Sequence, residues 1–212
     1  KAYNKNTNIM APHNKENTIW DVVVIGGGAS GMMAAGRAAE LGKKVLLLEK
    51  NTDLGKKLLI TGGGRSNITN NKMNTRELLS KYKGSDQFLF SAFSQFDVKE
   101  TLEFFNGRGM ATKEENEGRV FPLSNKAQSV WDVLYEYMRK GNVTIRKSSI
   151  VAGIGHAKDG SYTVIKTKSG NEVYAKVCIV ATGGTSRPET GSSGEGFAWL
   201  KKLGHTILES DA

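Results

Sequence analysis

The fold is decided by one stretch, residues 21–49, which reads DVVVIGGGASGMMAAGRAAELGKKVLLLE. The β-branched run at 21–25 predicts a buried parallel strand, because a strand covered on both faces is apolar without alternation. The Ala- and Met-rich segment 29–41 predicts a helix that ends at Gly42, and residues 45–49 predict a second buried strand. The stretch therefore predicts a β–α–β unit, the basis of a doubly wound α/β sheet.

A glycine motif connects the first strand to the helix. Gly26, Gly28 and Gly31 form the spacing G-x-G-x-x-G, and Glu49 follows at the end of the second strand. In such a unit the first glycine permits a tight turn, the second lets a pyrophosphate approach, and the third lets helix and strand pack closely. An acid at the position of Glu49 accepts hydrogen bonds from ribose hydroxyls, which favours FAD or NAD over NADP.

A second glycine-rich segment follows, GKKLLITGGGRSNITN at residues 55–70. Its three consecutive glycines expose backbone N–H groups, and Arg65 adds a cationic group, so the segment suits a diphosphate or an electron-rich ring edge. By composition alone, a flexible surface loop explains it equally well.

The rest of the chain predicts helices first and strands afterwards. Asp97 with Glu100 forms a capping-box pattern, and Ser124 is placed to cap a helix that runs to about Lys140. The four aromatic residues Phe88, Phe90, Phe93 and Phe96 predict a core. Turn residues separate segments 149–156, 162–168 and 172–174, which predicts a three-stranded meander. A separate buried strand is expected at 177–181, and a last helix at about 195–203.

Composition excludes several classes of protein. The 212 residues carry a net charge of +9, but the basic residues stand in scattered pairs, which indicates a solvated surface and no nucleic-acid partner. A single cysteine, Cys178, excludes an internal disulfide framework and indicates a reducing, cytoplasmic compartment. No apolar run reaches the length of a membrane span, and no metal-ligand spacing appears. Residues 1–19 lack periodicity and predict a disordered lead or linker.

Four segments in order resemble the YhiN/BaiN-like flavoproteins, a family of FAD-dependent oxidoreductases. They are residues 55–70, 88–96, 118–127 and 181–192, and the resemblance runs from about Trp20 to the end. It implies a Rossmann-like FAD-binding α/β fold with a parallel central sheet, an antiparallel β-meander and a helical insertion at about 72–140. The usual family form has Cys where this chain has Ser66.

The resemblance also implies which residues bind FAD. Val151 would offer backbone groups to the adenine, the turn at 181–184 would lie at the adenosine-diphosphate end, and residues 62–67 would lie nearer the diphosphate and flavin. For Arg119 two interpretations stand level: it faces substrate or the ring, or it pairs with Glu114, Glu115 and Glu117. The full expected cofactor set is Gly26, Gly28, Ala29, Ser30, Gly31, Glu49, Lys50, Lys57, Gly63, Gly64, Arg65, Ser66, Asn67, Val151, Ala181, Thr182, Gly183 and Gly184.

Family members continue into a substrate domain and return to complete the FAD site. We therefore expect residues 20–212 to be the N-terminal part of such an enzyme. The expected activity is hydride transfer through FAD, with NAD(P)H as donor and a small-molecule substrate. Two alternatives are an amine oxidase of the aminoacetone-oxidase type and an inactive or regulatory nucleotide-binding fragment. The catalytic residues and the oligomeric state stay unassigned.

Overall fold

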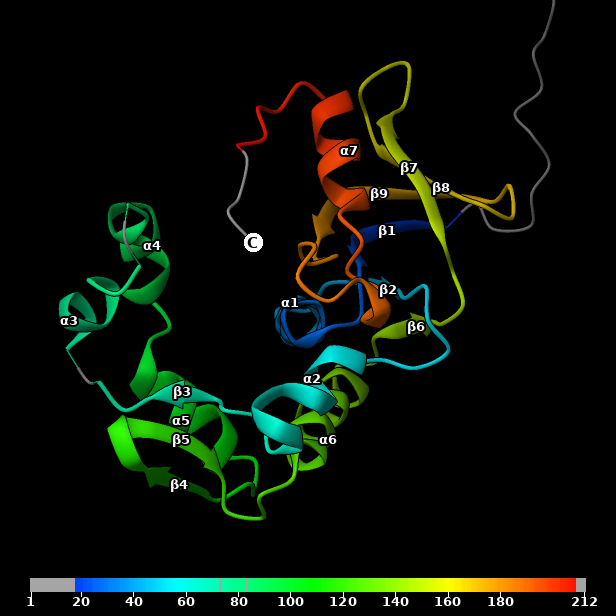
Figure 1. Ribbon diagram of the computed structural model, residues 1–212. Coiled ribbons are helices and arrows are strands. Elements are labelled where there is room, and N and C mark those ends of the chain that lie inside the picture. The colour runs from blue at the N-terminus through cyan, green and yellow to red at the C-terminus, as the bar shows by residue number, and fades with distance from the viewer. Residues whose placement is uncertain (1–17, 73, 83, 209–212) are drawn as a thin grey trace, which may run out of the picture.

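A computed structural model describes residues 18–72, 74–82 and 84–208 (Figure 1). Its main sheet has six strands in the order β6-β2-β1-β9-β8-β7. The first four, β6 (Thr144–Arg146), β2 (Val45–Leu48), β1 (Ile19–Ile25) and β9 (Glu172–Val180), run parallel. The last two, β8 (Thr163–Thr167) and β7 (Val151–His156), are antiparallel to their neighbours. A parallel sheet with an antiparallel meander is the predicted α/β class, which is confirmed.

The predicted β–α–β unit is present. Helix α1 (Ala29–Glu40) joins β1 to β2, and the register pairs Val22 with Val45 and Ile25 with Leu48. All four residues of β2 are buried, as expected for a central parallel strand. Strand β1 begins at Ile19, inside the segment expected to be a disordered lead, while residues 1–17 lie outside the described residues.

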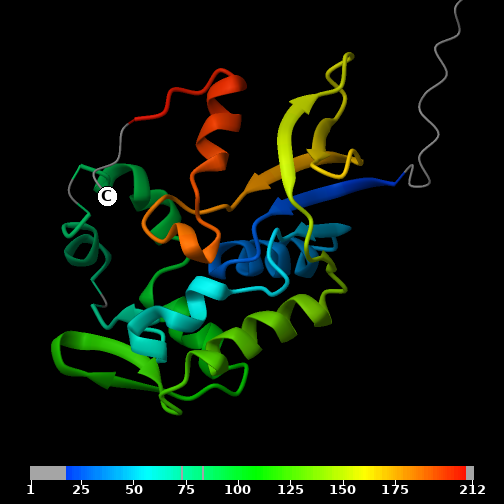
Figure 2. The same ribbon diagram turned by 45° about the vertical axis from the view of Figure 1, so that its right-hand side comes forward.

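Strand β9 corrects the prediction of two separate strands at 172–174 and 177–181. One strand spans Glu172–Val180, pairing antiparallel with β8 through its first half and parallel with β1 along most of its length. The exposed Lys176 interrupts the apolar pattern without breaking the strand, because the residues on both sides of it pair with β1, Ala175 with Trp20 and Val177 with Val22. The Lys176 Nζ also donates to Asp21 Oδ1 of β1 at 2.7 Å. The meander is thus continuous with the parallel sheet (Figure 2).

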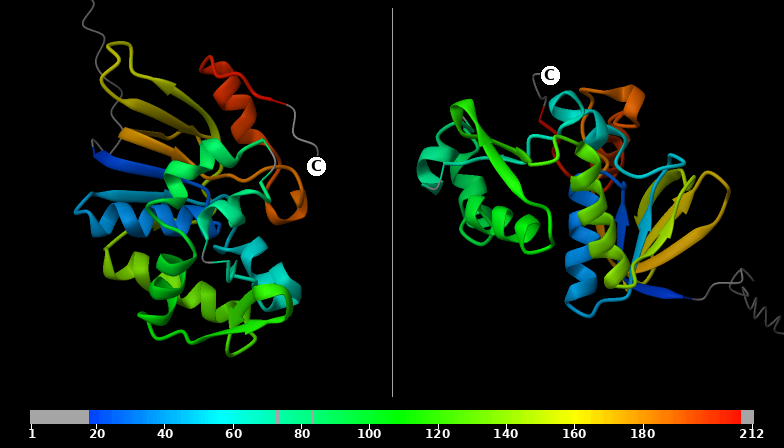
Figure 3. Two further views of the ribbon diagram at one scale, coloured as in Figure 1. Left: turned by 90° about the vertical axis from the view of Figure 1, so that its left-hand side faces the viewer. Right: turned by 90° about the horizontal axis from the view of Figure 1, so that it is seen from below.

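Different elements cover the two faces of the main sheet. Helices α1 and α6 (Ala127–Lys140) pack side by side on one face, and the β7–β8 hairpin curls over the other (Figure 3). Helix α7 (Glu195–Lys202) places Trp199 in the core beneath the hairpin, with Trp20 and Ile165. The predicted cap of α6 was wrong: Lys126 holds the N-cap position without a side-chain hydrogen bond, and the Ser124 hydroxyl accepts from the Lys126 amide.

A smaller sheet and three helices branch off beside α2 (Lys56–Ile60). The sheet has the order β3 (Thr69–Asn70), β5 (Arg119–Pro122), β4 (Thr112–Glu115), and the helices are α3 (Thr75–Leu79), α4 (Asp86–Phe93) and α5 (Val98–Asn106). The capping box of Asp97 and Glu100 at the start of α5 is confirmed.

The aromatic residues of α4, and Phe96 after its end, do not form the predicted core. Phe88 is 86% exposed, and Phe90 and Phe96 are 46% and 42% exposed. The α3–α4 pair stands away from the main sheet (Figure 1), and Phe93 contacts Tyr82 at 5.9 Å between ring centroids. A cluster of aromatic residues indicates that another surface covers it. The sequence does not show whether that surface belongs to the described part of the chain.

Tyr137 ties helix α6 to α1 and to the end of α5. Its hydroxyl donates to Glu40 Oε2 at 2.8 Å, and its ring meets Phe104 edge-on at 5.1 Å. The Arg108 guanidinium lies 3.9 Å from the Phe104 ring centroid and 4.6 Å from that of Tyr137. This cluster therefore fixes α5, which belongs to the branch with the smaller sheet, to the layer formed by α1 and α6.

We expect the Tyr137 phenol to make stability fall in alkali. Burial, and then the hydrogen bond to Glu40, raises the pKa of Tyr137 to about 12, above the ~10 of an exposed tyrosine. The protonated phenol therefore stabilises the fold fully below pH 10, and this contribution is lost between pH 10 and 12. Tyr137→Phe should lower the free energy of unfolding by about 1–2 kcal/mol at pH 8. Above pH 10 the free energies of unfolding of the variant and the parent should move closer together. Urea unfolding at pH 8, 10 and 11 measures both, and parallel pH curves would contradict the argument.

Candidate dinucleotide site

A cavity of about 480 Å³ opens at the carboxyl ends of β1, β2 and β9. Ligands of open α/β sheets bind at this edge, and the volume falls within the ~300–1,000 Å³ of small-molecule sites. Three loops supply most of the walls: the turn after β1, the segment from Glu49 through Asn67, and the segment after β9.

The three motif glycines have three different surroundings. Gly26 has φ +106°, and a Cβ there would lie 2.4 Å from the Ala181 carbonyl oxygen. A Cβ on Gly31 would lie 1.9 Å from the Gly26 carbonyl oxygen, whereas a Cβ on Gly28 would meet nothing within 4 Å. Gly26 and Gly31 thus fix backbone packing, and Gly28 keeps the mouth of the cavity open.

The N-terminus of α1 faces this opening. The first hydrogen bond of the helix runs from the Met32 amide to the Gly28 carbonyl, so the amides of Ala29, Ser30 and Gly31 have no partner within it. Ala29 and Ser30 line the cavity and Gly31 does not. Free amides and the helix dipole make this end of the cavity suitable for an anion.

Glu49 is buried at the rim, with 6% of its surface exposed. Its Oε2 accepts from the Gly27 amide and its Oε1 from the Asn51 amide, both at 2.7 Å. Each carboxylate oxygen keeps a further lone pair for a ribose hydroxyl. Glu49 therefore also clamps the glycine turn to the end of β2, a role that its spacing did not predict.

Two lysines line the cavity in different states. Lys50 Nζ donates to Glu195 Oε2 at 2.7 Å and to Ser193 Oγ at 2.8 Å, across 145 and 143 residues of chain. Lys57 Nζ lies 3.7 Å from the position of a Cβ on Gly183, and within the described ranges it has no hydrogen-bond or ion-pair partner. Lys57 is thus available to an anionic ligand.

The glycine loop only partly reaches the cavity. It comprises α2 (Lys56–Ile60) and η1 (Thr61–Gly64), and Thr61, Ser66 and Asn67 line the walls, whereas Gly63 and Gly64 do not.

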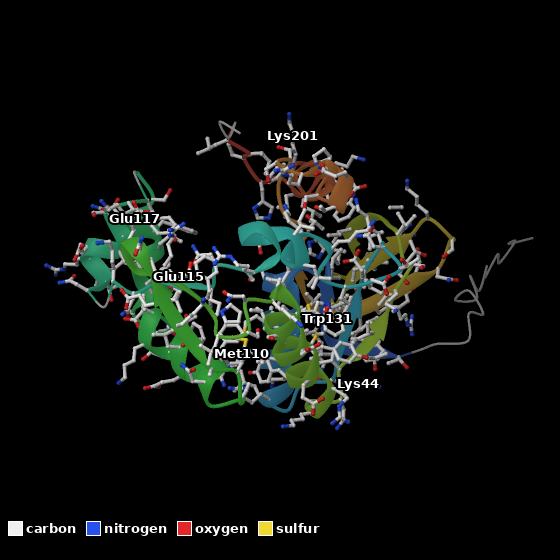
Figure 4. The ribbon with its side chains drawn as sticks, turned by 60° about the horizontal axis from the view of Figure 1, so that its bottom comes forward. Lys44, Met110, Glu115, Glu117, Trp131 and Lys201 are labelled. Carbon is white, nitrogen blue, oxygen red and sulfur yellow. The ribbon has the colours of Figure 1, made fainter. Side chains whose placement is uncertain are left out.

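Arg65 lies outside the walls because it has partners on the smaller sheet. Its Nη1 lies 3.0 Å from both carboxylate oxygens of Glu115, and its guanidinium lies 4.2 Å from the Phe121 ring centroid. Hydrogen bonds from Lys113 and Arg65 hold the pKa of Glu115 below its usual range, so this carboxylate stays charged. Figure 4 places Glu115 on that sheet, to one side of Trp131 and α6. The Arg65 guanidinium, which was expected to contact the cofactor, thus binds Glu115 and anchors the glycine loop to the smaller sheet.

The other residues predicted to bind the cofactor also divide into those that line the cavity and those that do not. Val151, Ala181, Thr182 and Gly183 line the cavity, and Gly184 does not. Sequence reasoning missed a second group of lining residues, Asn51, Ser149, Thr190, Ser192, Glu195 and Trp199. Cross-chain contacts position some of them, such as Asn51 Nδ2 donating to the Thr190 carbonyl at 3.2 Å.

Of the two roles predicted for Arg119, the ion pair with neighbouring glutamates is wrong, and the contact with substrate or ring stays a prediction, although Arg119 does not line the cavity. Its Nε donates to the Asn116 carbonyl at 3.1 Å, and it forms no ion pair with Glu114, Glu115 or Glu117 among the residues described.

The described part of the chain shows neither a metal-binding cluster nor a membrane-spanning helix. It holds no group of three or more His, Cys, Asp or Glu side chains placed to bind a metal ion. Within the same residues, no helix combines the length and the apolar character needed to cross a membrane.

Comparison with known proteins gives matches over nearly the whole chain. Residues 20–210 match the HI0933-like protein Rossmann domain. The chain is 37% identical to a 3-dehydro-bile acid delta(4,6)-reductase of Clostridium scindens, over 87% of this chain and 44% of the relative. It is 33% identical to a ribosomal RNA dihydrouridine synthase of Escherichia coli, over 91% of this chain and 46% of the relative. The chain thus spans under half the length of these relatives.

Solved structures share the fold at low identity. A 3-ketosteroid-delta4-(5alpha)-dehydrogenase of Rhodococcus jostii matches with a TM-score of 0.61 at 17% identity, over 84% of this chain and 48% of its own. A flavocytochrome c3 fumarate reductase matches with a TM-score of 0.59 at 20% identity, over 89% of this chain and 41% of its own.

Proposed function

Because the chain belongs to the HI0933-like Rossmann-domain family, a family of FAD-dependent oxidoreductases, we propose that it is the FAD-binding part of an enzyme that reduces a carbon–carbon double bond conjugated to a carbonyl. One observation carries the FAD assignment: the open space at Gly28, facing the free amides of α1, with Glu49 at the rim. A dinucleotide needs this combination of a phosphate cradle and a ribose acceptor.

The residues present fit FAD from its adenosine end onward. Glu49 would accept from the ribose, the amides of Ala29 and Ser30 would face the diphosphate, and Lys57 would supply a counter-charge. The backbone at Val151 would meet the adenosine, and Ser66 and Asn67 would lie toward the ring; all three line the cavity. When bound, FAD supplies a two-electron carrier that takes hydride from a nicotinamide donor and delivers it to the substrate.

The reaction class follows from what the two relatives' names have in common. A 3-oxo bile acid with double bonds at positions 4 and 6 and a uracil ring each present an alkene conjugated to a carbonyl. The proposed net reaction adds hydride from NAD(P)H to the β-carbon and a solvent proton to the α-carbon, giving NAD(P)⁺ and the saturated product. We propose a small-molecule substrate, since the basic residues form scattered pairs, and a cytoplasmic location, since a single cysteine, Cys178, offers no internal disulfide framework.

Titration of the chain with FAD tests the assignment. We expect one FAD per chain, detected by flavin fluorescence, and a dissociation constant about tenfold higher in Lys57→Gln, because a charge-assisted contact to the diphosphate is lost. Lys201→Gln, on the exposed side of α7, is the matched control and should leave the dissociation constant unchanged (Figure 4). Failure to bind FAD, or equal effects of the two variants, would overturn the assignment.

A further inference from the structure

A second cavity, of about 220 Å³, lies between α1, α5 and α6. It shares Ala29, Leu58, Ser66 and Asn67 with the dinucleotide cavity, so the two spaces meet at the end of the glycine loop. Its volume is below the ~300 Å³ of a complete small-molecule site, so it suits one end of a ligand whose remainder lies outside.

The walls of this second cavity are almost entirely apolar. Phe104, Phe105, Val130 and Leu134 are buried, and the half-buried Met33 and the partly exposed Phe96 complete the lining. The one polar side chain away from the junction, Thr101, donates its hydroxyl to the Asp97 carbonyl at 2.6 Å. A ligand that enters therefore meets hydrocarbon and aromatic surfaces on most sides.

The polar groups available to a ligand stand where the two cavities join. Ser66 is only 3% exposed and has φ +57°, a left-handed conformation that is unfavourable for a residue with a Cβ. Within the described residues, no partner accepts from or donates to the hydroxyl of this buried residue. The neighbouring Asn67 is exposed, and its side-chain amide is free to turn toward a ligand. Buried polar groups normally have partners, and strained backbone gathers at functional sites. Both features point to a ligand.

We infer that the second cavity receives the apolar ring of a cyclic enone substrate, with the ring carbonyl at Ser66 and Asn67. This inference rests on the proposed function, because it places the substrate beside the ring end of the FAD site. The Ser66 hydroxyl and the Asn67 side-chain N–H donate to the carbonyl oxygen and stabilise the negative charge it gains as hydride adds to the β-carbon. The hydrocarbon skeleton lies against Phe96, Phe104 and Met33.

The lining favours such a ring over the uracil of an RNA. Uracil carries two carbonyls and a ring N–H, and burying them against aromatic walls without hydrogen-bond partners is unfavourable. A cyclic enone has a single carbonyl, which the two donors at the junction satisfy. The cavity thus selects for a ligand with one polar edge.

Direct ligand binding to the whole chain tests the inference without relying on turnover. The probe is 4-androstene-3,17-dione, whose ring A is a cyclic enone, titrated by calorimetry with and without FAD. Met33→Trp fills the cavity from α1 and should raise the probe's dissociation constant at least tenfold while leaving FAD binding unchanged. Phe88→Trp, at an exposed site outside both cavities, is the matched control and should change neither. Ser66→Ala should weaken probe binding about three- to tenfold through loss of one hydrogen bond.

The outcomes separate the two proposals. FAD binding without probe binding, or probe binding insensitive to Met33→Trp, overturns the cavity assignment and leaves the FAD assignment standing. Probe binding that depends on Met33, in a chain that does not bind FAD, keeps the ligand site and overturns the proposed function. Tighter binding of uridine than of the probe, lost in Met33→Trp, overturns the apolar ring as occupant. Circular dichroism melts of each variant identify any that fail to fold.

Discussion

Gly31→Ala should lower the free energy of unfolding by roughly 3 kcal/mol or more, because the added methyl group would overlap neighbouring backbone atoms. A Cβ on Gly31 would lie 1.9 Å from the carbonyl oxygen of Gly26. That oxygen belongs to backbone held between α1 and β9, so neither side can move without separating the helix from the sheet. Urea unfolding of the chain without ligand measures the loss.

Gly28→Ala provides the matched comparison three residues away. Gly28 has an extended backbone, with φ −77° and ψ −176°, and a Cβ there meets nothing within 4 Å, so the fold should keep its stability within about 1 kcal/mol. The added methyl group would occupy the space proposed for the diphosphate, so the dissociation constant for FAD should rise at least tenfold. If both variants lose stability equally, or Gly28→Ala binds FAD as the parent does, the division of roles among the glycines is wrong.

Glu49→Ala should damage stability and cofactor binding together. Removing the carboxylate leaves the amides of Gly27 and Asn51 without acceptors in a buried setting, and each orphaned amide destabilises by about 1–3 kcal/mol. The free energy of unfolding should therefore fall by roughly 2–5 kcal/mol before any ligand is added, and FAD affinity should fall further through loss of the ribose contact.

Glu49→Gln separates these two roles. Its side chain keeps one acceptor oxygen and replaces the other with a donor, so the loss in stability should lie between those of the parent and Glu49→Ala. Unfolding curves without ligand and FAD titrations, measured on the same preparations, check both roles. An unchanged stability in Glu49→Ala would refute the clamp and leave the ribose contact to be judged by the titration alone.

The sequence predicts best those parts of the fold that depend on neighbours in the chain. The β–α–β unit at 21–49 and the capping box at Asp97 need only local patterns, and both are present. Lys176 breaks the apolar run, so the sequence predicts two strands, and only the pairing with β1 on both sides of Lys176 shows why the strand continues. The prediction of a core around Phe88, Phe90 and Phe96 is wrong for a related reason. Burial of an aromatic side chain needs a covering surface, which composition does not reveal.

The same limit applies to the candidate site. The motif positions Gly26, Gly28 and Glu49 lie in or around the cavity because the turn and strand ends that carry them are set locally. Arg65 and Asn51 could not be placed in this way, because each is held by a partner from a distant segment, Glu115 and Thr190 respectively. Residue type tells which chemistry is available, and tertiary contacts decide which side chain is already engaged.

The central position of β9 has a consequence for how the chain folds as it is made. Strand β1 leaves the ribosome with β2 close behind to cover one of its edges, but the strand for its other edge arrives about 150 residues later, as Asp21 and Lys176 show at a separation of 155. At roughly 5–20 residues per second, that edge waits about 8–31 s with its backbone groups unpaired. Nascent chains arrested before residue 172 would thus present the unpaired edge of β1 to chaperones or to one another. This aggregation-prone edge would be covered only once Glu172–Val180 has been synthesised.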